Sequence, residues 1–149
     1  MLDKNAIGRT SPPAANEVER GAIRRFAEAL GDYNPIYFDE TYARAAGYPA
    51  VVAPPTFPAS FHSAADLREL LGVGVKSLLH AEQAFEYERP IFAGDRIHVS
   101  TRVADIQERT GPAGRMEVAL VDDEGRDDAG KLVFRSRRTL VVRSTREVS

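Results

Sequence analysis

The chain has 149 residues, a formal net charge of −2 and no cysteine. This length suits one domain with its own core, so we expect a single domain over residues 1–149. The slightly acidic balance lacks the basic footprint of a nucleic-acid-binding protein. The absence of cysteine excludes disulfides, a thiol nucleophile and cysteine-ligated metals. No segment approaches the ~18 apolar residues of a spanning helix and the N-terminus lacks an apolar signal core, so we expect no membrane association and a cytoplasmic location.

The first part of the chain predicts an extended arm followed by a helix. Residues 1–16 contain Pro12 and Pro13 and little periodicity, which is typical of an arm without regular structure. From 18 to 30, apolar residues recur at the three-and-four spacing of one helical face. They are Val18, Ala22, Ile23, Phe26, Ala27 and Leu30. Gly31 then ends the helix, because glycine tolerates a positive φ.

Residues 31–37 read Gly-Asp-Tyr-Asn-Pro-Ile-Tyr and predict a rigid loop. Asp32 and Asn34 are turn formers whose short side chains bond nearby backbone groups, and Pro35 restricts Asn34 to extended conformations. The loop therefore holds one carboxylate still. The competing interpretation is that Asp32 and Asn34 act only as turn and capping residues.

Two further helices are expected after this loop. The segment 41–46 is a short helical candidate that Gly47 ends. Pro54 and Pro55 can open a helix, because its first amides need no internal partner. A central helix is therefore expected from Thr56 to Leu71, ended by the glycines at 72 and 74.

The remainder of the chain predicts strands separated by turns. Apolar and β-branched residues alternate in four segments. These are residues 77–87, 96–106, 116–121 and 132–142. Helices first and hairpin-linked strands afterwards indicate an α+β fold with an antiparallel sheet.

The helix, the Gly-Asp-x-Asn-Pro loop and the later Ala-Ala-Gly-Tyr at 45–48 resemble the MaoC-like hydratases. The resemblance implies a hot-dog fold, in which an antiparallel sheet wraps a long central helix. In that family, the Asp of this motif and a His two residues after its Pro form the catalytic dyad. Asp32 matches the Asp, Asn34 and Pro35 match the Asn-Pro, and Tyr37 stands in the place of the His.

A second resemblance, closer than the first, covers residues 46–57 and 85–95. These stretches, Ala46 to Phe57 and Phe85 to Asp95, are similar to the N-terminal MaoC-type dehydratase family. That family includes mycobacterial fatty-acid dehydratase subunits that pair with a separate catalytic subunit. The resemblance implies an acyl-CoA or acyl-carrier-protein thioester as substrate, no cofactor, and a homodimer or a heterodimer with a catalytic MaoC-type chain.

The implied reaction is the reversible loss of water from a 3-hydroxyacyl thioester, which needs a base, an acid and donors for the enolate oxygen. Asp32 can orient the water, and a free amide of Thr56 or Phe57 at the start of the central helix can hold the thioester carbonyl. Asn34 is also expected to bind substrate. Tyr37 is a poor base, since its reference pKa is near 10.

Three histidines are potential substitutes for the missing base. His80 is the best candidate, because residues 79–85 also look like the dehydratase relatives near their substrate tunnel. His62 is expected to be a packed or surface side chain on the central helix, and His98 to point to solvent. No histidine spacing demands a metal. Arg135, Arg137 and Arg138 are interpreted as a solvated strand face, with phosphate contacts as the alternative.

Two function classes compete with the hydratase hypothesis. A hot-dog thioesterase would need an acid on the central helix, and Asp66 lies toward its C-terminal half, away from the donor end. A non-enzymatic acyl-thioester-binding protein would leave Asp32 dispensable. Within the hydratase hypothesis, a substrate-binding subunit and a self-sufficient homodimer both remain open.

Overall fold

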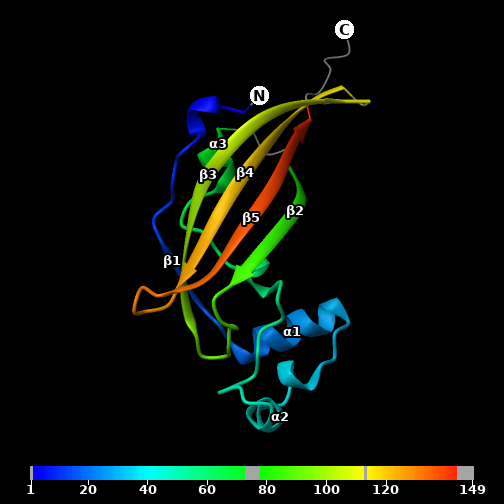
Figure 1. Cartoon of the computed structure of the whole chain (residues 1–149), viewed down its shortest axis with the longest axis vertical. Coiled ribbons are helices and arrows are strands. Elements are labelled where there is room, and N and C mark those ends of the chain that lie inside the picture. The colour runs from blue at the N-terminus through cyan, green and yellow to red at the C-terminus, as the bar shows by residue number, and fades with distance from the viewer. Residues whose placement is uncertain (1, 73–77, 113, 144–149) are drawn as a thin grey trace.

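A computed structural model describes residues 2–72, 78–112 and 114–143 of the chain (Figure 1). Its helices are α1 (Arg20–Leu30), α2 (Glu40–Ala45) and α3 (Leu67–Leu71), with 3-10 turns η1 (Lys4–Ala6), η2 (Pro35–Tyr37) and η3 (Phe57–Ser60). Its strands are β1 (Ala14–Glu17), β2 (Leu78–Tyr87), β3 (Arg96–Gly111), β4 (Gly114–Arg126) and β5 (Leu132–Arg143).

The strands form one five-stranded sheet in the order β1-β3-β4-β5-β2, and every neighbouring pair is antiparallel. The predicted α+β class is therefore confirmed. Four of the strands overlap the predicted segments, although β3 continues to Gly111 and β4 is longer at both ends, from Gly114 to Arg126. Of the first predicted strand, Ser77 lies outside the described residues.

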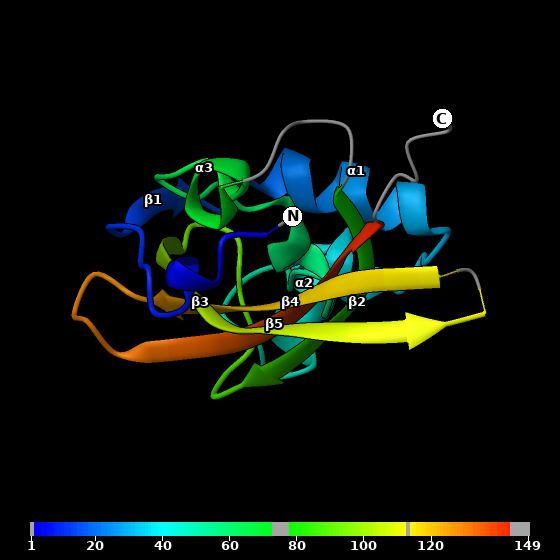
Figure 2. The same ribbon diagram turned by 90° about the horizontal axis from the view of Figure 1, so that it is seen from above.

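Helices α1 and α3 lie on one side of the sheet, which we call its inner face. Figure 2 shows α1 and α3 on the same side of the strands. Ile23 and Ala27 of α1 pack in one buried cluster with β3 and β5 residues, and Leu70 and Leu71 of α3 pack in a second cluster. Alternation along each strand supplies these clusters, because every second side chain points to the same face.

The predicted extended arm is packed against the domain rather than separate from it. It contains β1, which pairs with β3 and which the sequence analysis missed. Leu2 and Ala6 are buried in the cluster around α3. The arm is therefore a structural part of the sheet and its inner face.

The predicted continuous helix from Thr56 to Leu71 is wrong. The chain makes only the 3-10 turn η3, becomes extended at Phe61 (φ −69°, ψ 147°), and forms helix again at α3. Asn16 of β1 fixes the extended part: its side chain accepts from the His62 amide (2.8 Å) and donates to the His62 carbonyl (3.0 Å). These distant contacts replace the local hydrogen bonds of a helix.

Candidate functional site

The Asp32 loop has the rigid geometry that its sequence predicts. Helix α1 ends at Gly31, whose φ of 68° lies in the left-handed region that glycine favours. Asp32 Oδ1 then accepts from the Asn34 amide (3.2 Å), and Asn34 Oδ1 accepts from the Ile36 amide (3.2 Å). Both side chains are exposed, so the loop presents an anchored carboxylate to solvent.

Tyr37 follows this loop on η2 and is buried, with 7% of its surface exposed. Burial raises its pKa above the ordinary value of 10.0, and the charge of Asp32 and the neighbouring Tyr48 raise it further. Tyr37 therefore keeps its proton near neutral pH. Its hydroxyl can therefore donate a hydrogen bond.

A cavity of about 400 Å³ lies beside Tyr37. We call it the tyrosine pocket, because its lining includes Tyr37, Tyr48 and Tyr87 together with Val52, Pro55 and Ile91. The Tyr87 hydroxyl donates to the Pro55 carbonyl, and burial raises the pKa of the Tyr87 phenol. The pocket thus combines apolar walls with the hydroxyl groups of Tyr37 and Tyr87, whose pKa values are raised.

The two expected oxyanion donors differ in their surroundings. Thr56 is exposed, whereas Phe57 is 4% exposed and packs edge-on against Phe26 and Phe61. The Phe57 amide donates to the Pro54 carbonyl (2.9 Å), so the expectation that it is free is wrong. The reason is that η3 begins with a tight turn instead of an α-helical N-terminus.

His80 is not near the Asp32 loop. It lies on β2, seven residues before Tyr87, so at about 3.3 Å per residue the two backbones are roughly 23 Å apart along the strand. It lines a different cavity on the inner face of the sheet. The chain therefore does not bring His80 together with Asp32 and Tyr37.

The other two histidines occupy separate places. His62 is exposed and its backbone is held by Asn16. His98 lies between the buried Ile97 and Val99 on the opposite, solvent-facing side of β3, where its Nε2 is 2.7 Å from a carboxylate oxygen of the exposed Asp128. Within the described ranges, no group of three or more His, Asp or Glu side chains is arranged to hold a metal ion.

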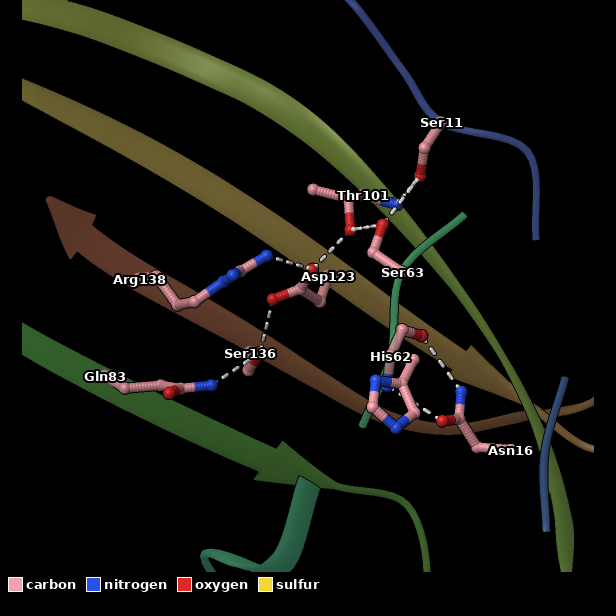
Figure 3. A network of polar contacts seen from close by, with 9 residues as sticks. All are labelled: Ser11, Asn16, His62, Ser63, Gln83, Thr101, Asp123, Ser136 and Arg138. Atoms are coloured by element: carbon pink, nitrogen blue, oxygen red, sulfur yellow. Dashed lines mark hydrogen bonds and ion pairs between the residues drawn. The ribbon is translucent and has the colours of Figure 1, made fainter. Parts of the chain in front are cut away.

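Sequence reasoning missed a polar network on the inner face (Figure 3). Asp123 accepts from Thr101 (2.7 Å), Ser136 (3.2 Å) and Arg138 (2.8 Å). The interpretation of Arg138 as part of a solvated face is wrong, since its side chain is 22% exposed and turned toward Asp123. Strand alternation was the available signal: Arg138 lies an even number of residues from the apolar Phe134 and Leu140.

Arg137 points the other way and pairs with Asp122 through its Nε (2.7 Å) and an Nη (2.9 Å) on the outer face. Arg135 lies 3.6 Å from Glu124. These two arginines fit the predicted solvated face. Asp66 is the N-cap of α3 and accepts from the Arg68 amide, which assigns it a structural contact.

The chain thus has an antiparallel sheet covered by helices on one face, and an Asp-x-Asn-Pro loop follows the first of these helices. This arrangement agrees with the class of MaoC-like dehydratases. The chain belongs to the family described as "FAS1-like, dehydratase domain region", whose model matches residues 5–136. A UPF0336 protein of Streptomyces coelicolor is 40% identical, over 98% of both chains. One of Saccharopolyspora erythraea is also 40% identical, over 98% of this chain and 94% of that one.

Solved structures agree with this family. A MaoC-like dehydratase is 31% identical with a TM-score of 0.81, covering 98% of this chain and 45% of that one. The C-terminally truncated HadBC (3R-hydroxyacyl-ACP dehydratase) complex of Mycobacterium tuberculosis matches at 26% identity and a TM-score of 0.75, over 91% and 96% of the chains. The predicted hot-dog fold is confirmed, but its long central helix is interrupted here. In the described part of the chain, no helix is long and apolar enough to cross a membrane.

Proposed function

We propose that this chain is the thioester-binding subunit of an (R)-specific enoyl-thioester hydratase or 3-hydroxyacyl-thioester dehydratase, located in the cytoplasm. The observation that carries the proposal is Tyr37, which stands at the dyad's histidine position with a raised pKa. His80, the expected substitute, lines another cavity. A catalytic base must then come from elsewhere.

The tyrosine pocket supplies binding groups for a thioester. Its apolar walls suit the carbon chain near the reacting bond, and the protonated Tyr37 hydroxyl suits the thioester carbonyl as a hydrogen-bond donor. The Asp32 carboxylate accepts a hydrogen bond from the Asn34 amide, and in this proposal it orients a water molecule at the rim of the tyrosine pocket. In this scheme, a base removes the C2 proton of a 3-hydroxyacyl thioester and an acid protonates the C3 hydroxyl, so that the C3–O bond breaks to release water as the C2–C3 double bond forms.

We further propose that a second hot-dog chain of the MaoC type supplies the His. Strand β2 is at the edge of the sheet, has ten residues and is mostly exposed, including Leu79 at 52%. Such an edge presents unpaired backbone groups that favour pairing with another chain. One of the similar structures is itself a two-component complex. A homodimer through the same edge is the alternative assembly.

The test is hydration of crotonyl-CoA and a longer trans-2-enoyl-CoA, followed by the loss of absorbance of the conjugated double bond. We expect the purified chain alone to bind the thioester without turnover, and to support turnover when co-expressed with a His-containing MaoC chain. Asp32→Asn and Tyr37→Phe are the variants to compare in the complex. Turnover by the chain alone that Asp32→Asn abolishes would refute the partner requirement and support the homodimer.

A matched variant separates the subunit hypothesis from simple acyl binding. Tyr37→His restores the dyad pattern beside Asp32, so we expect weak turnover by this variant without a partner. Thioester binding with no rate in any combination, unaffected by Asp32→Asn, would instead support a non-enzymatic acyl-binding protein. No thioester binding at all would overturn the proposal.

A further inference from the structure

Strand β2 forms one edge of the sheet, and the outer face of this edge is acidic (Figure 1). Ala84 is the cross-strand partner of Arg137, whose side chain lies on the outer face. Alternation places Glu82 and Glu86, two residues to either side of Ala84, on the outer face as well. Both glutamates are exposed, and β2 contains no lysine or arginine. The edge therefore presents carboxylates without cations of its own.

The neighbouring strand β5 does not neutralise these glutamates. Arg135 is the cross-strand partner of Glu86, but its Nε lies 3.6 Å from a carboxylate oxygen of Glu124 on β4. Arg137 donates two hydrogen bonds to Asp122 of β4 (2.7 Å and 2.9 Å). Among the described residues, no ion pair includes a β2 carboxylate. The carboxylates of β2 are therefore open to a cation from another chain.

A hollow of about 550 Å³ adjoins this edge on the outer face. Its lining includes Ala84 and Glu86 of β2. The rest of its outer-face lining includes the paired side chains of β4 and β5, namely Asp122, Glu124, Arg135 and Arg137. Because alanine ends at its Cβ, the position between the two glutamates has room for a long side chain. The flexible stem of a lysine or arginine fits there and brings its charge to Glu86.

Two β2 strands that pair with each other bring like charges together. Identical antiparallel strands pair about a twofold axis, so outer-face residues of one strand lie opposite outer-face residues of the other. With the axis at Ala84, Glu82 of each copy lies directly opposite Glu86 of the other copy. With the axis at an adjacent residue, a glutamate of each copy lies opposite Ala84 and diagonal to a glutamate of the other. Like charges in these positions are destabilising, so β2 disfavours a second copy of itself.

We propose that β2 selects a partner strand that carries a lysine or arginine on its outer face, and that this side chain lies over Ala84 and binds Glu82 and Glu86. The occupant of the edge is then a different hot-dog chain and not a second copy. This selectivity rests on the proposed function, in which a second MaoC-type chain supplies the His. Backbone hydrogen bonds hold such a pair of strands together, and the charges determine which strands pair.

The first test measures association of the full-length chain with itself and with a charge-reversed copy. The charge-reversed copy carries Glu82→Lys and Glu86→Lys, which place two cations on the same face of the same strand. Sedimentation velocity with a fluorescent label on one of the two chains distinguishes mixed pairs from self-pairs. At low ionic strength, we expect the mixed pair to be about tenfold tighter than either self-pair. Added salt should reduce this difference, because it screens exposed charges.

A neutral variant isolates the contribution of repulsion. Glu82→Gln with Glu86→Gln keeps the shape of both side chains and removes their charge, so it should self-associate about fivefold more tightly than the wild type. The matched control is Glu19→Gln with Glu69→Gln. Both control residues are exposed and lie outside β2, and their replacement changes the net charge by the same amount. The control should self-associate as the wild type does.

The same reversal is then tested in the complex with a co-expressed His-containing MaoC chain. Glu82→Lys with Glu86→Lys should weaken that complex about tenfold, because the cations of the partner then face cations. The control variant with Glu19→Gln and Glu69→Gln should leave the complex unchanged. A complex that tolerates the reversal would overturn the selectivity.

Two further results would overturn the selectivity. One is a mixed pair no tighter than the wild-type self-pair, including no association of either. The other is equal self-association of the neutral variant and the wild type. If the charge-reversed copy does not fold, the neutral variant alone decides. Absence of thioester binding, or of any complex between the wild type and a MaoC chain, refutes the proposed function, whereas association with the charge-reversed copy still decides the selectivity of the edge.

Discussion

Burial and the charge of the Asp32 carboxylate both raise the pKa of the Tyr37 phenol, so Asp32 opposes deprotonation of Tyr37 instead of assisting it. The neutral Tyr37 hydroxyl can donate a hydrogen bond and the Asp32 carboxylate can accept one. The protonation of Tyr37 can be followed through the absorbance of its phenolate.

Asp32→Asn should lower the pKa of Tyr37, because it removes a negative charge that disfavours the phenolate. Burial remains, so the pKa should stay above 10.0. The measurement is a phenolate absorbance titration of each chain, from which the titration of the same chain carrying Tyr37→Phe is subtracted. An unchanged Tyr37 titration in Asp32→Asn would contradict the electrostatic coupling.

The stability of the fold should fall as the pH rises above 10. Tyr37 and Tyr87 both have raised pKa values in the folded chain. Above pH 10 the unfolded chain has released these protons and the folded chain still holds them, so higher pH favours unfolding. Urea unfolding midpoints at pH 8 and pH 11 measure the loss.

Tyr87→Phe should reduce this alkaline loss of stability, because a phenyl ring does not titrate. Tyr33→Phe is the matched control, since Tyr33 is 70% exposed and lies outside the tyrosine pocket. Equal alkaline sensitivity of the wild type and Tyr87→Phe would show that burial of Tyr87 does not control this behaviour.

Gly125→Ala should destabilise the chain by about 1–3 kcal/mol or more, because a methyl group has no space there. An added Cβ would overlap the Phe134 ring and approach Ile97 Cγ2 to 2.9 Å. Gly111→Ala is the control, since its nearest neighbour would be Met116 Cε at 3.5 Å, an ordinary contact. Urea denaturation compares the two, and similar midpoints would be inconsistent with the close approach.

Replacing only one residue of the buried Asp123–Arg138 ion pair should lower the free energy of unfolding more than replacing both with apolar residues. Arg138→Met alone leaves Asp123 without its cation, at a cost of about 3–5 kcal/mol, whereas Asp123→Leu combined with Arg138→Met should be closer to neutral. Free energies of unfolding for both single variants and the double variant test this. A double variant less stable than either single one would show that the pair stabilises the fold.

The parts of the fold that the sequence predicted depend on local patterns. Helix α1 follows from apolar spacing, its end from Gly31, and the four long strands from alternation between turn residues. The segment 56–71 was mispredicted, because Asn16 holds its backbone from 46 residues away in the sequence. No local pattern reveals such a contact.

For the candidate site, too, the sequence predicted the local features and missed the distant contacts. The Asp32 loop was visible, since turn chemistry is local. The distance between His80 and the Asp32 loop depends on how β2 crosses the sheet, which spacing alone does not give. Strand alternation predicts that Arg138 lies on the inner face. The sequence analysis instead treated the three arginines as one group on a solvent-facing strand and did not assign each residue to a face.

Side-chain bonds from Asn16 to His62 and from Ser11 to Ser63 hold the layer between η3 and α3, where an ordinary hot-dog domain would have a cooperative helix. Such a layer can detach over a few residues without unwinding any helix, since each bond breaks independently. The N-terminal arm therefore supplies the contacts that fix residues 61–63 against the sheet.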